Sequence, residues 1–227
     1  FFWVTASLQL SMPTIRCQCG EVTVTFPSTR SCIDCCCVDC YDKNEWAASK
    51  GGPAFPPDVA ARRQPLELRH VTGRLVVTGK DKLQFNRLRP HAISTNCYAK
   101  CCHTILFVDN FFYAGNAVLI FPDLVRLEGD EDRKPNLRVH IRDWPAEDYA
   151  KLPPLPGFFV GGGEGEDWEA QQLKLRTDVR GPVSPRHEGQ SFKELLEECG
   201  GHVEVLDLPR GKLSFQPTGG DMPPTTS

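Results

Sequence analysis

The clustering of its cysteines constrains this chain more than any other feature. All but one of its eleven cysteines fall within three short segments, and Cys199 stands alone far downstream. The three cysteine groups, in chain order, are Cys17-Gln-Cys19, then Cys32 with Cys35-Cys36-Cys37-Val-Asp-Cys40, and finally Cys97-Tyr-Ala-Lys-Cys101-Cys102. Thiolates at such close spacing converge on a soft cation, and zinc is the usual one at sites of this kind.

Disulfides are the alternative use for this many cysteines. Disulfide-stapled domains are usually short and spread their cysteines along the chain, whereas here they bunch in Cys-x-Cys and Cys-x-x-Cys pairs. An odd count of eleven also leaves at least one free thiol, which favours a reducing compartment. We therefore expect two bound zinc ions per chain, one structural and one reactive, and an intracellular, cytoplasmic location.

Length and charge narrow the possible classes further. The 227 residues favour one domain with an appended tail. A net charge of −3 provides no general attraction to nucleic acid or to anionic membranes. No apolar stretch approaches the roughly 18 residues of a membrane span. We expect neither nucleic acid nor membrane as a partner.

The order of apolar and polar residues predicts a mainly β protein with few short helices. Several segments alternate polar and apolar residues as half-buried strands do, and glycines separate some of them. Helices are expected over 39–48 and 190–199, with a helical turn over 146–152. Strands are expected over 14–19, 21–26, 66–71, 74–78, 82–86, 93–98, 104–108, 117–121, 137–141 and 203–206.

Composition divides the chain into three parts. We expect Met12 to be the native start, so that residues 1–13 form an extension that is either non-native or disordered. Residues 14–158 form the predicted zinc domain. Proline-rich residues 153–156 and glycine-rich residues 161–166 interrupt the pattern, so 159–227 is expected to be a linker and C-terminal extension.

A structural zinc needs four ligands, and two separated turns commonly supply two each. Cys17 and Cys19 make one half. The third cysteine group makes the other half, from Cys97 with Cys101 or Cys102. Because Cys101 and Cys102 are adjacent, binding one ion with both would strain the peptide between them. We expect one of them to bind zinc and the other to pack in the core.

The second cysteine group indicates a different site. Cys35, Cys37 and Cys40 offer three thiolates from one tight turn, and three protein ligands with an open fourth position are typical of a reactive zinc. Three thiolates leave Zn²⁺ with a net negative charge, which blunts its action on water but suits an incoming thiol. A fourth ligand from Cys32 or Cys36 would instead close the site.

The histidines carry less weight. His103 follows the third cysteine group and is interpreted as a polar turn residue. His140, within Val-His-Ile, is interpreted as one residue of an alternating strand. The sequence contains no phosphate-binding loop and no dinucleotide-binding motif.

These motifs resemble the superfamily of glutathione-dependent formaldehyde-activating enzymes and centromere protein V. The resemblance covers residues 14–155 and implies a Mss4-like antiparallel β-sandwich. It also implies that the first and third cysteine groups share a structural zinc while the second holds a reactive one. The matching motifs are Cys17-Gln-Cys19-Gly-Glu-Val22, Cys35-Cys-Cys37-Val-Asp-Cys40, the third cysteine group and His140-Ile-Arg-Asp-Trp144.

The chain departs from the family pattern in three places. Tyr41-Asp-Lys-Asn-Glu45 replaces the basic residues and Ser-Gly that commonly follow Cys40. Cys36 stands where the family usually has histidine. The third cysteine group reads Tyr98-Ala-Lys-Cys101-Cys102-His-Thr104, similar to a divergent branch of the superfamily. The substrate contacts beside the second group therefore do not carry over.

The cysteine motifs and the family resemblance are compatible with three functions. The first is a zinc-dependent carbon–sulfur lyase that binds a small thiol, such as glutathione, and joins it to or releases it from a small electrophile. The second is a non-catalytic, zinc-stabilised binding module of the same fold. The third, a relative of methionine sulfoxide reductase B, would need Cys199 as its redox cysteine, and that residue lies beyond the predicted linker.

Overall fold

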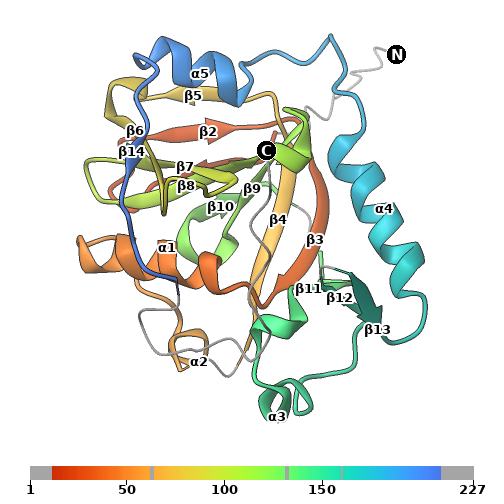
Figure 1. Cartoon of the computed structure of the whole chain (residues 1–227). Helices are drawn as coiled ribbons and strands as arrows, with labels where there is room; N and C mark the ends of the chain where they lie inside the picture. Colours follow the sequence, from red (N-terminus) through yellow and green to blue (C-terminus); the bar gives the residue numbers. More distant parts are fainter. Residues whose placement is uncertain (1–11, 62–63, 131–132, 160, 211–227) are drawn as a thin grey trace, which may run out of the picture.

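Two β-sheets make up most of the fold (Figure 1). The computed structural model describes residues 12–61, 64–130, 133–159 and 161–210. The predictions for residues 1–11 and 211–227 lie outside the described residues. The smaller sheet has the spatial order β10 (Arg126–Glu128), β1 (Thr14–Arg16), β2 (Thr23–Thr25) and β5 (Val76–Thr78). The larger sheet has the order β13 (Gly162–Glu164), β12 (Gly157–Phe159), β11 (Arg138–Val139), β3 (Thr29–Cys35), β4 (Leu66–Thr72), β9 (Ala117–Ile120), β8 (Thr104–Asn110), β7 (Ser94–Ala99), β6 (Leu83–Arg87) and β14 (Glu204–Val205).

Most neighbouring strands run antiparallel. The exceptions are β11, which pairs parallel to both β3 and β12, and β14, which pairs parallel to β6. Few and mostly short helices accompany the sheets, so the predicted mainly β class is confirmed. The helices are α1 (Val38–Ser49), α2 (Pro57–Ala60), α3 (Ala146–Tyr149), α4 (Trp168–Arg180) and α5 (Phe192–Glu198).

One hydrophobic core lies between the two sheets. Ile15 and Val24 of the smaller sheet meet Phe85, Phe107 and Ile120 of the larger sheet there, and all are buried. Strands of both sheets supply apolar side chains to this core from one face, as a pleated strand allows. This packing makes the fold sandwich-like.

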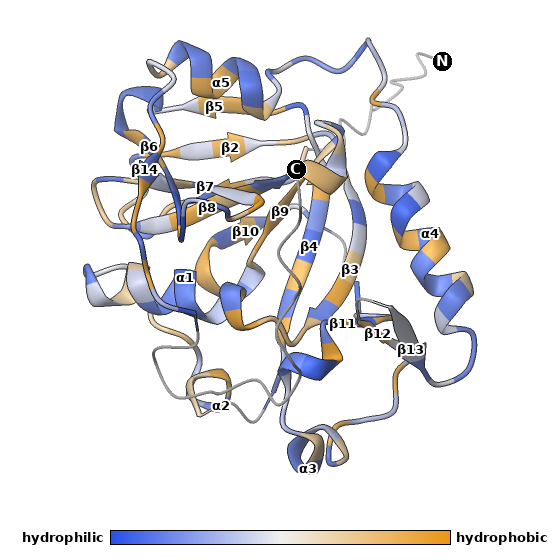
Figure 2. Cartoon of the chain, in the orientation of Figure 1, coloured by the Kyte–Doolittle hydropathy of each residue, from blue (hydrophilic) through white to orange (hydrophobic). Residues whose placement is uncertain are grey.

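A second core covers the opposite face of the larger sheet. On β9 the side chains alternate, so that Val118 and Ile120 enter the first core while Leu119 enters the second. The apolar character of β9 along its length is visible in Figure 2. Tyr41 of α1 and Trp144 cover this face. The central strands of the larger sheet are therefore buried on both faces, and α1 is held against them.

Residues 161–210 belong to the part of the chain predicted to be a linker and C-terminal extension. They pack against elements of both sheets. Figure 1 shows α4 alongside β3 and α5 beside β5. Arg30 on β3 donates to the carbonyl oxygens of Asp178 and Gly181 at 2.8 and 2.7 Å. Phe192 of α5 packs edge-on against Phe85 with ring centroids 5.5 Å apart. The domain boundaries stay a prediction.

Helix α5 begins with a reciprocal capping arrangement. The Ser191 side chain accepts from the backbone N–H of Glu194, whose carboxylate accepts from the backbone N–H of Ser191. This motif explains why α5 begins at Phe192, two residues after the predicted start at residue 190. Among the described helices, none combines the length and the apolar character that crossing a membrane requires.

Candidate metal centres

Four cysteines from two distant turns converge at the end of the smaller sheet. The Sγ atoms of Cys17, Cys19, Cys101 and Cys102 all lie within 4.8 Å of one another. The Sγ–Sγ distances are 3.4 Å for Cys17–Cys19, 3.2 Å for Cys19–Cys101 and 3.9 Å for Cys101–Cys102. A tetrahedral zinc with Zn–S bonds of about 2.3 Å has S–S edges of about 3.8 Å. This four-cysteine site therefore matches the size of one metal ion.

Hydrogen bonds from backbone N–H groups orient the thiols of the first turn. Gly20 adopts φ +85°, and its N–H donates to the carbonyl oxygen of Cys17 at 3.0 Å. The backbone N–H of Val22 then donates to the Cys17 sulfur at 3.3 Å. The backbone N–H of Gln18 donates to the Thr104 hydroxyl at 3.0 Å, which fastens this turn to the turn between β7 and β8.

The hydrogen bonds around this site favour a thiolate. Burial raises the pKa of the Cys102 thiol, but hydrogen bonds from Thr104 and from the backbone N–H of Cys19 outweigh burial and bring that pKa to about 6. The Thr104 hydroxyl lies 3.1 Å from the Cys102 sulfur. Burial raises the pKa of the Cys17 thiol. Metal binding releases the remaining protons, since thiolates are the ligand form.

The structure places the three candidate cysteines of the third group differently from the sequence-based expectation. Both Cys101 and Cys102 belong to the four-cysteine site, although one was expected to pack in the core. Cys97 lies in the first core with no exposed surface. The reason is that Cys97 is within β7, paired with Phe107 of β8, whereas Cys101 and Cys102 lie past the strand end. His103 stacks on Tyr98 with ring centroids 6.0 Å apart and joins neither site.

Three cysteines of the second group form another cluster. The sulfurs of Cys35, Cys37 and Cys40 lie within 4.8 Å of one another, and Cys35 and Cys40 are 3.8 Å apart. Cys35 ends β3, Cys37 is the N-cap of α1, and Cys40 lies in the first turn of α1. The backbone N–H of Cys37 donates to the Cys35 sulfur at 3.4 Å. This three-cysteine site can hold a metal ion.

The two cysteines considered for closing this site point elsewhere. Cys32 lines a polar cavity between β3 and α4, and burial raises the pKa of its thiol to about 12. Cys36 lines a different cavity beside Tyr41 and Trp144. Neither belongs to the metal-ligating groups found among the described residues. Side chains alternate along the extended backbone, so Cys36 faces away from Cys35 and Cys37.

Sequence reasoning missed two residues beside the three-cysteine site. His140 and Asp143 group with Cys37, each offering a ligand atom within 4.8 Å of the others. His140 does not continue a strand as predicted, because it adopts φ +58° and caps the short helical turn Ile141–Asp143. The parallel pairing of Val139 with Cys35 brings the residues after β11 to those after β3. The His140–Trp144 motif was the only sequence signal for this juxtaposition.

Charge in the three-cysteine site is asymmetric. Burial raises the pKa of Cys35 well above its usual range. Hydrogen bonds from the Cys35 and Cys37 thiols lower the pKa of Cys40 well below its usual range, against burial, and the Lys43 ammonium lowers it further. Lys43 is only 3% exposed. A buried cation that acts on Cys40 offsets part of the negative charge that three thiolates would give a bound divalent metal.

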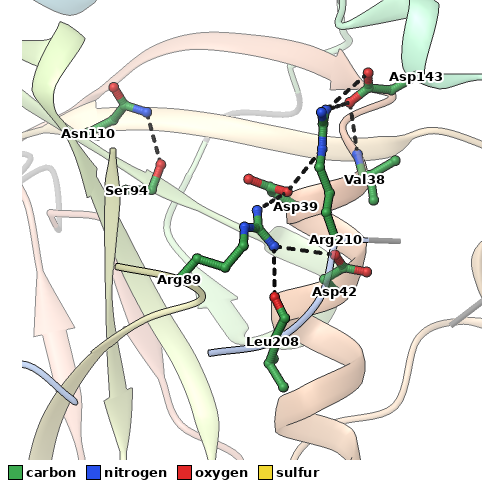
Figure 3. Close-up of polar contacts among 9 residues, drawn as sticks. All are labelled: Val38, Asp39, Asp42, Arg89, Ser94, Asn110, Asp143, Leu208 and Arg210. Carbon is green, nitrogen blue, oxygen red and sulfur yellow. Dashed lines mark hydrogen bonds and ion pairs between the residues drawn. The ribbon is translucent and has the colours of Figure 1, made fainter. Parts of the chain in front are cut away.

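A network of arginines and aspartates joins the start of α1 to Asp143, the residue that groups with Cys37 (Figure 3). Arg89 pairs with Asp39 of α1, and Arg210 reaches both Asp39, at 3.7 Å, and Asp143, at 3.2 Å. Arg89 also donates to the carbonyl oxygen of Leu208 at 3.4 Å. The segment after β14 is thereby tied to the start of α1 and to the turn that carries Asp143.

Comparisons with known proteins give this chain no family. No protein-family model matches it, and no curated protein matches it either. Its function must therefore be argued from the two cysteine sites.

Proposed function

We propose that this protein is a zinc-dependent enzyme of the carbon–sulfur lyase type, a divergent relative of the glutathione-dependent formaldehyde-activating enzymes. One observation carries the proposal. Cys35, Cys37 and Cys40 converge, while Cys32 and Cys36, the two cysteines able to complete a four-sulfur site, line separate cavities. Three sulfurs leave a fourth position for a ligand from outside.

The two sites would have different tasks. Cys17, Cys19, Cys101 and Cys102 would hold a structural zinc that joins the turn after β1 to the turn after β7. Cys35, Cys37 and Cys40 would hold a second zinc, which when bound supplies a position where a thiol is favoured as its thiolate. The buried Lys43 ammonium supports this assignment because it stabilises negative charge on Cys40.

The proposed reaction is the reversible addition of a small thiol, such as glutathione, to a small carbonyl compound. The thiol sulfur forms a bond to the carbonyl carbon, and the π electron pair of the C=O bond moves to the oxygen. The proton released by the thiol ends on that oxygen. The reverse reaction breaks the C–S bond and returns the proton to sulfur, so no oxidant or reductant is needed.

The experiment uses the full chain loaded with zinc. The rate of glutathione addition to an aldehyde is measured by exchange NMR, and absorption spectra of the cobalt-substituted protein are recorded as thiol is added. We expect acceleration over the uncatalysed reaction and a spectral change on thiol addition. Cys37→Ser should abolish both, and Cys32→Ser, a matched change outside the site, should retain both. No acceleration and no spectral change would reject the enzyme proposal.

The second candidate is a non-catalytic binding module, and one observation favours it. His140 and Asp143 lie close enough to Cys37 to offer a nitrogen or an oxygen as a fourth ligand. A site closed in this way would be structural. Thiol-dependent spectra decide between the candidates, because a closed site would not change when thiol is added.

A further inference from the structure

A polar cavity lies between β3, α4 and the segment 133–136, which leads into β11. Its volume is about 310 Å³. Figure 1 shows α4 running alongside β3, and both elements supply walls of the cavity. Among the described residues that line it, none belongs to either cysteine site. The cavity is therefore a possible binding place that is separate from the proposed metal centres.

The walls of this cavity carry an excess of positive charge. Four cationic side chains line it, and among its described lining residues the one carboxylate is that of Asp178. The cations come from all three walls: Arg30 of β3, Arg133 and Lys134 of the segment 133–136, and Lys174 of α4. Four positive charges and one negative charge leave these walls at +3, whereas the whole chain has a net charge of −3. The excess predicts an anionic ligand.

Arg30 supplies charge to the cavity while its N–H groups hold the end of α4. Its guanidinium donates to the carbonyl oxygens of Asp178 and Gly181 at 2.8 and 2.7 Å. Neutral carbonyl oxygens satisfy these donors without cancelling the positive charge. Arg30 is half-buried, so solvent screens its charge less than it screens that of an exposed lysine.

Lys174 has an ammonium that can exchange its partner. It pairs with the Asp178 carboxylate four residues later on α4, and its side chain is 59% exposed. Exposed ion pairs of this kind contribute little to stability, because water and salt screen them. An anion with more charge can therefore replace the carboxylate as the partner of Lys174, and Asp178 does not close the cavity to anions.

The uncharged walls suit a short organic group. The Asn136 side-chain N–H donates to the Gln171 side-chain oxygen at 3.3 Å, which links the segment 133–136 to α4. Leu175 adds an apolar surface. The Cys32 thiol adds no negative charge near neutral pH, because burial raises its pKa to about 12. These walls and the cations beside them predict a ligand with one anionic end and one small organic end.

We propose that this cavity binds a small phosphate monoester. Such a group carries nearly two negative charges near neutral pH, and its three terminal oxygens accept hydrogen bonds from several directions. A carboxylate has one charge and two oxygens, so it matches cations on three walls less well. An engineered cavity of about 150 Å³ holds benzene, so about 310 Å³ admits roughly twelve heavy atoms, the phosphate group included. The site does not depend on the proposed reaction, because its described walls contain no proposed zinc ligand.

Calorimetric titration of the zinc-loaded full chain with glycerol 3-phosphate tests the proposal. We expect saturable binding, and Lys134→Met combined with Lys174→Met should weaken it about tenfold or more, as the loss of two charged contacts implies. Lys151→Met combined with Lys193→Met is the matched control. It removes the same charge from exposed pairs outside the cavity, so the affinity should stay unchanged. Glycerol, which lacks the phosphate, should not bind.

Backbone ¹⁵N signals locate the bound probe. Those of Lys134, Asn136 and Gln171 should shift as glycerol 3-phosphate is added, whereas that of Val38, which directly follows Cys37, should not. A shift at Val38 alone, with an affinity that the Lys134 and Lys174 substitutions leave unchanged, would place the phosphate at the second zinc and overturn the proposal. Absence of saturable binding would also overturn it. Equal affinity for acetate or for inorganic phosphate would reject a phosphate monoester as the ligand.

Discussion

The Asp143 carboxylate accepts a hydrogen bond from the backbone N–H of Val38 at a distance of 3.2 Å. Val38 is the first residue of α1 and directly follows Cys37. A carboxylate at this end of a helix pairs with an otherwise unsatisfied N–H and with the positive end of the helix dipole. The contact fixes the turn that carries Cys37 to the turn that carries His140, so both sides of the three-cysteine site are positioned together.

Removing this contact should loosen the three-cysteine site. Asp143→Ala should lower the zinc affinity of that site about tenfold or more, the usual effect of losing a residue that orients a metal ligand. Asp143→Asn retains an acceptor oxygen and should lose less zinc affinity than Asp143→Ala. Competition with a chromophoric chelator measures the affinity. Equal affinities for the wild type and Asp143→Ala would show that Val38 does not need this acceptor.

The four-cysteine site predicts which cysteines affect the metal content. Cys101→Ser and Cys102→Ser should each lose one zinc equivalent and lower the melting temperature. Cys97→Ala should keep the full zinc content and cost only about 1–2 kcal/mol, because it removes a buried sulfur from the first core. Elemental analysis and thermal unfolding of the three variants provide the comparison. Loss of zinc from Cys97→Ala would place Cys97 among the ligands.

Lys43 should control how readily acid removes the second metal. Its ammonium lowers the pKa of the Cys40 thiol. Lys43→Met should therefore raise the pKa of Cys40, so protons compete with zinc at a higher pH and the midpoint of zinc release moves upward. A zinc indicator followed during acid titration measures this midpoint. Lys80→Met, at an exposed pair with Glu198, serves as the control and should not move it. An unchanged midpoint in Lys43→Met would show that Lys43 does not influence the protonation of the thiolates.

His70 should make the free energy of unfolding depend on pH. Burial lowers the pKa of its imidazole from 6.5 to about 3 in the folded protein. It lies between Ser31, 2.8 Å from Nδ1, and Tyr113, 3.1 Å from Nε2. Below pH 6.5 the unfolded chain binds a proton that the folded chain does not, so the free energy of unfolding falls as the pH is lowered from 6.5 toward 3. At pH 5 the loss is about 2 kcal/mol.

Urea unfolding of wild type and His70→Gln at pH 7 and pH 5 checks this expectation. The variant carries no titratable group at this position, so its loss of stability between the two pH values should be smaller by about 2 kcal/mol. Identical losses in the two proteins would mean that His70 binds its proton equally well in the folded and unfolded chains.

Local patterns predicted many of the strands whose side chains alternate, but β3 and α4 are among the elements that needed tertiary context. β3 (Thr29–Cys35) is rich in polar residues and cysteines, and it is a strand because β4 and β11 pair with it on either side. α4 (Trp168–Arg180) has a weak apolar stripe and lies alongside β3, with Leu175 packed against the second core and Val179 buried. Propensity alone does not reveal elements that depend on their neighbours.

The cysteine sites were predictable to the extent that spacing determines them. Cys35, Cys37 and Cys40 lie in one turn, so their convergence follows from local sequence. The exclusion of Cys97 depends on which face of β7 it occupies. The approach of His140 depends on the parallel pairing of β11 with β3, two segments far apart in the chain. Local sequence carries no information on such a pairing.

The proposed function requires two zinc ions on this chain, one bound by four cysteines and one by three. Elemental analysis combined with zinc X-ray absorption spectroscopy tests it most directly, on protein purified under reducing conditions without added metal. We expect two zinc ions per chain and an average of about 3.5 sulfur ligands per zinc. Cys17→Ser should leave a spectrum dominated by three sulfurs and one lighter atom. A single zinc per chain, or four sulfurs around every zinc, would contradict the account.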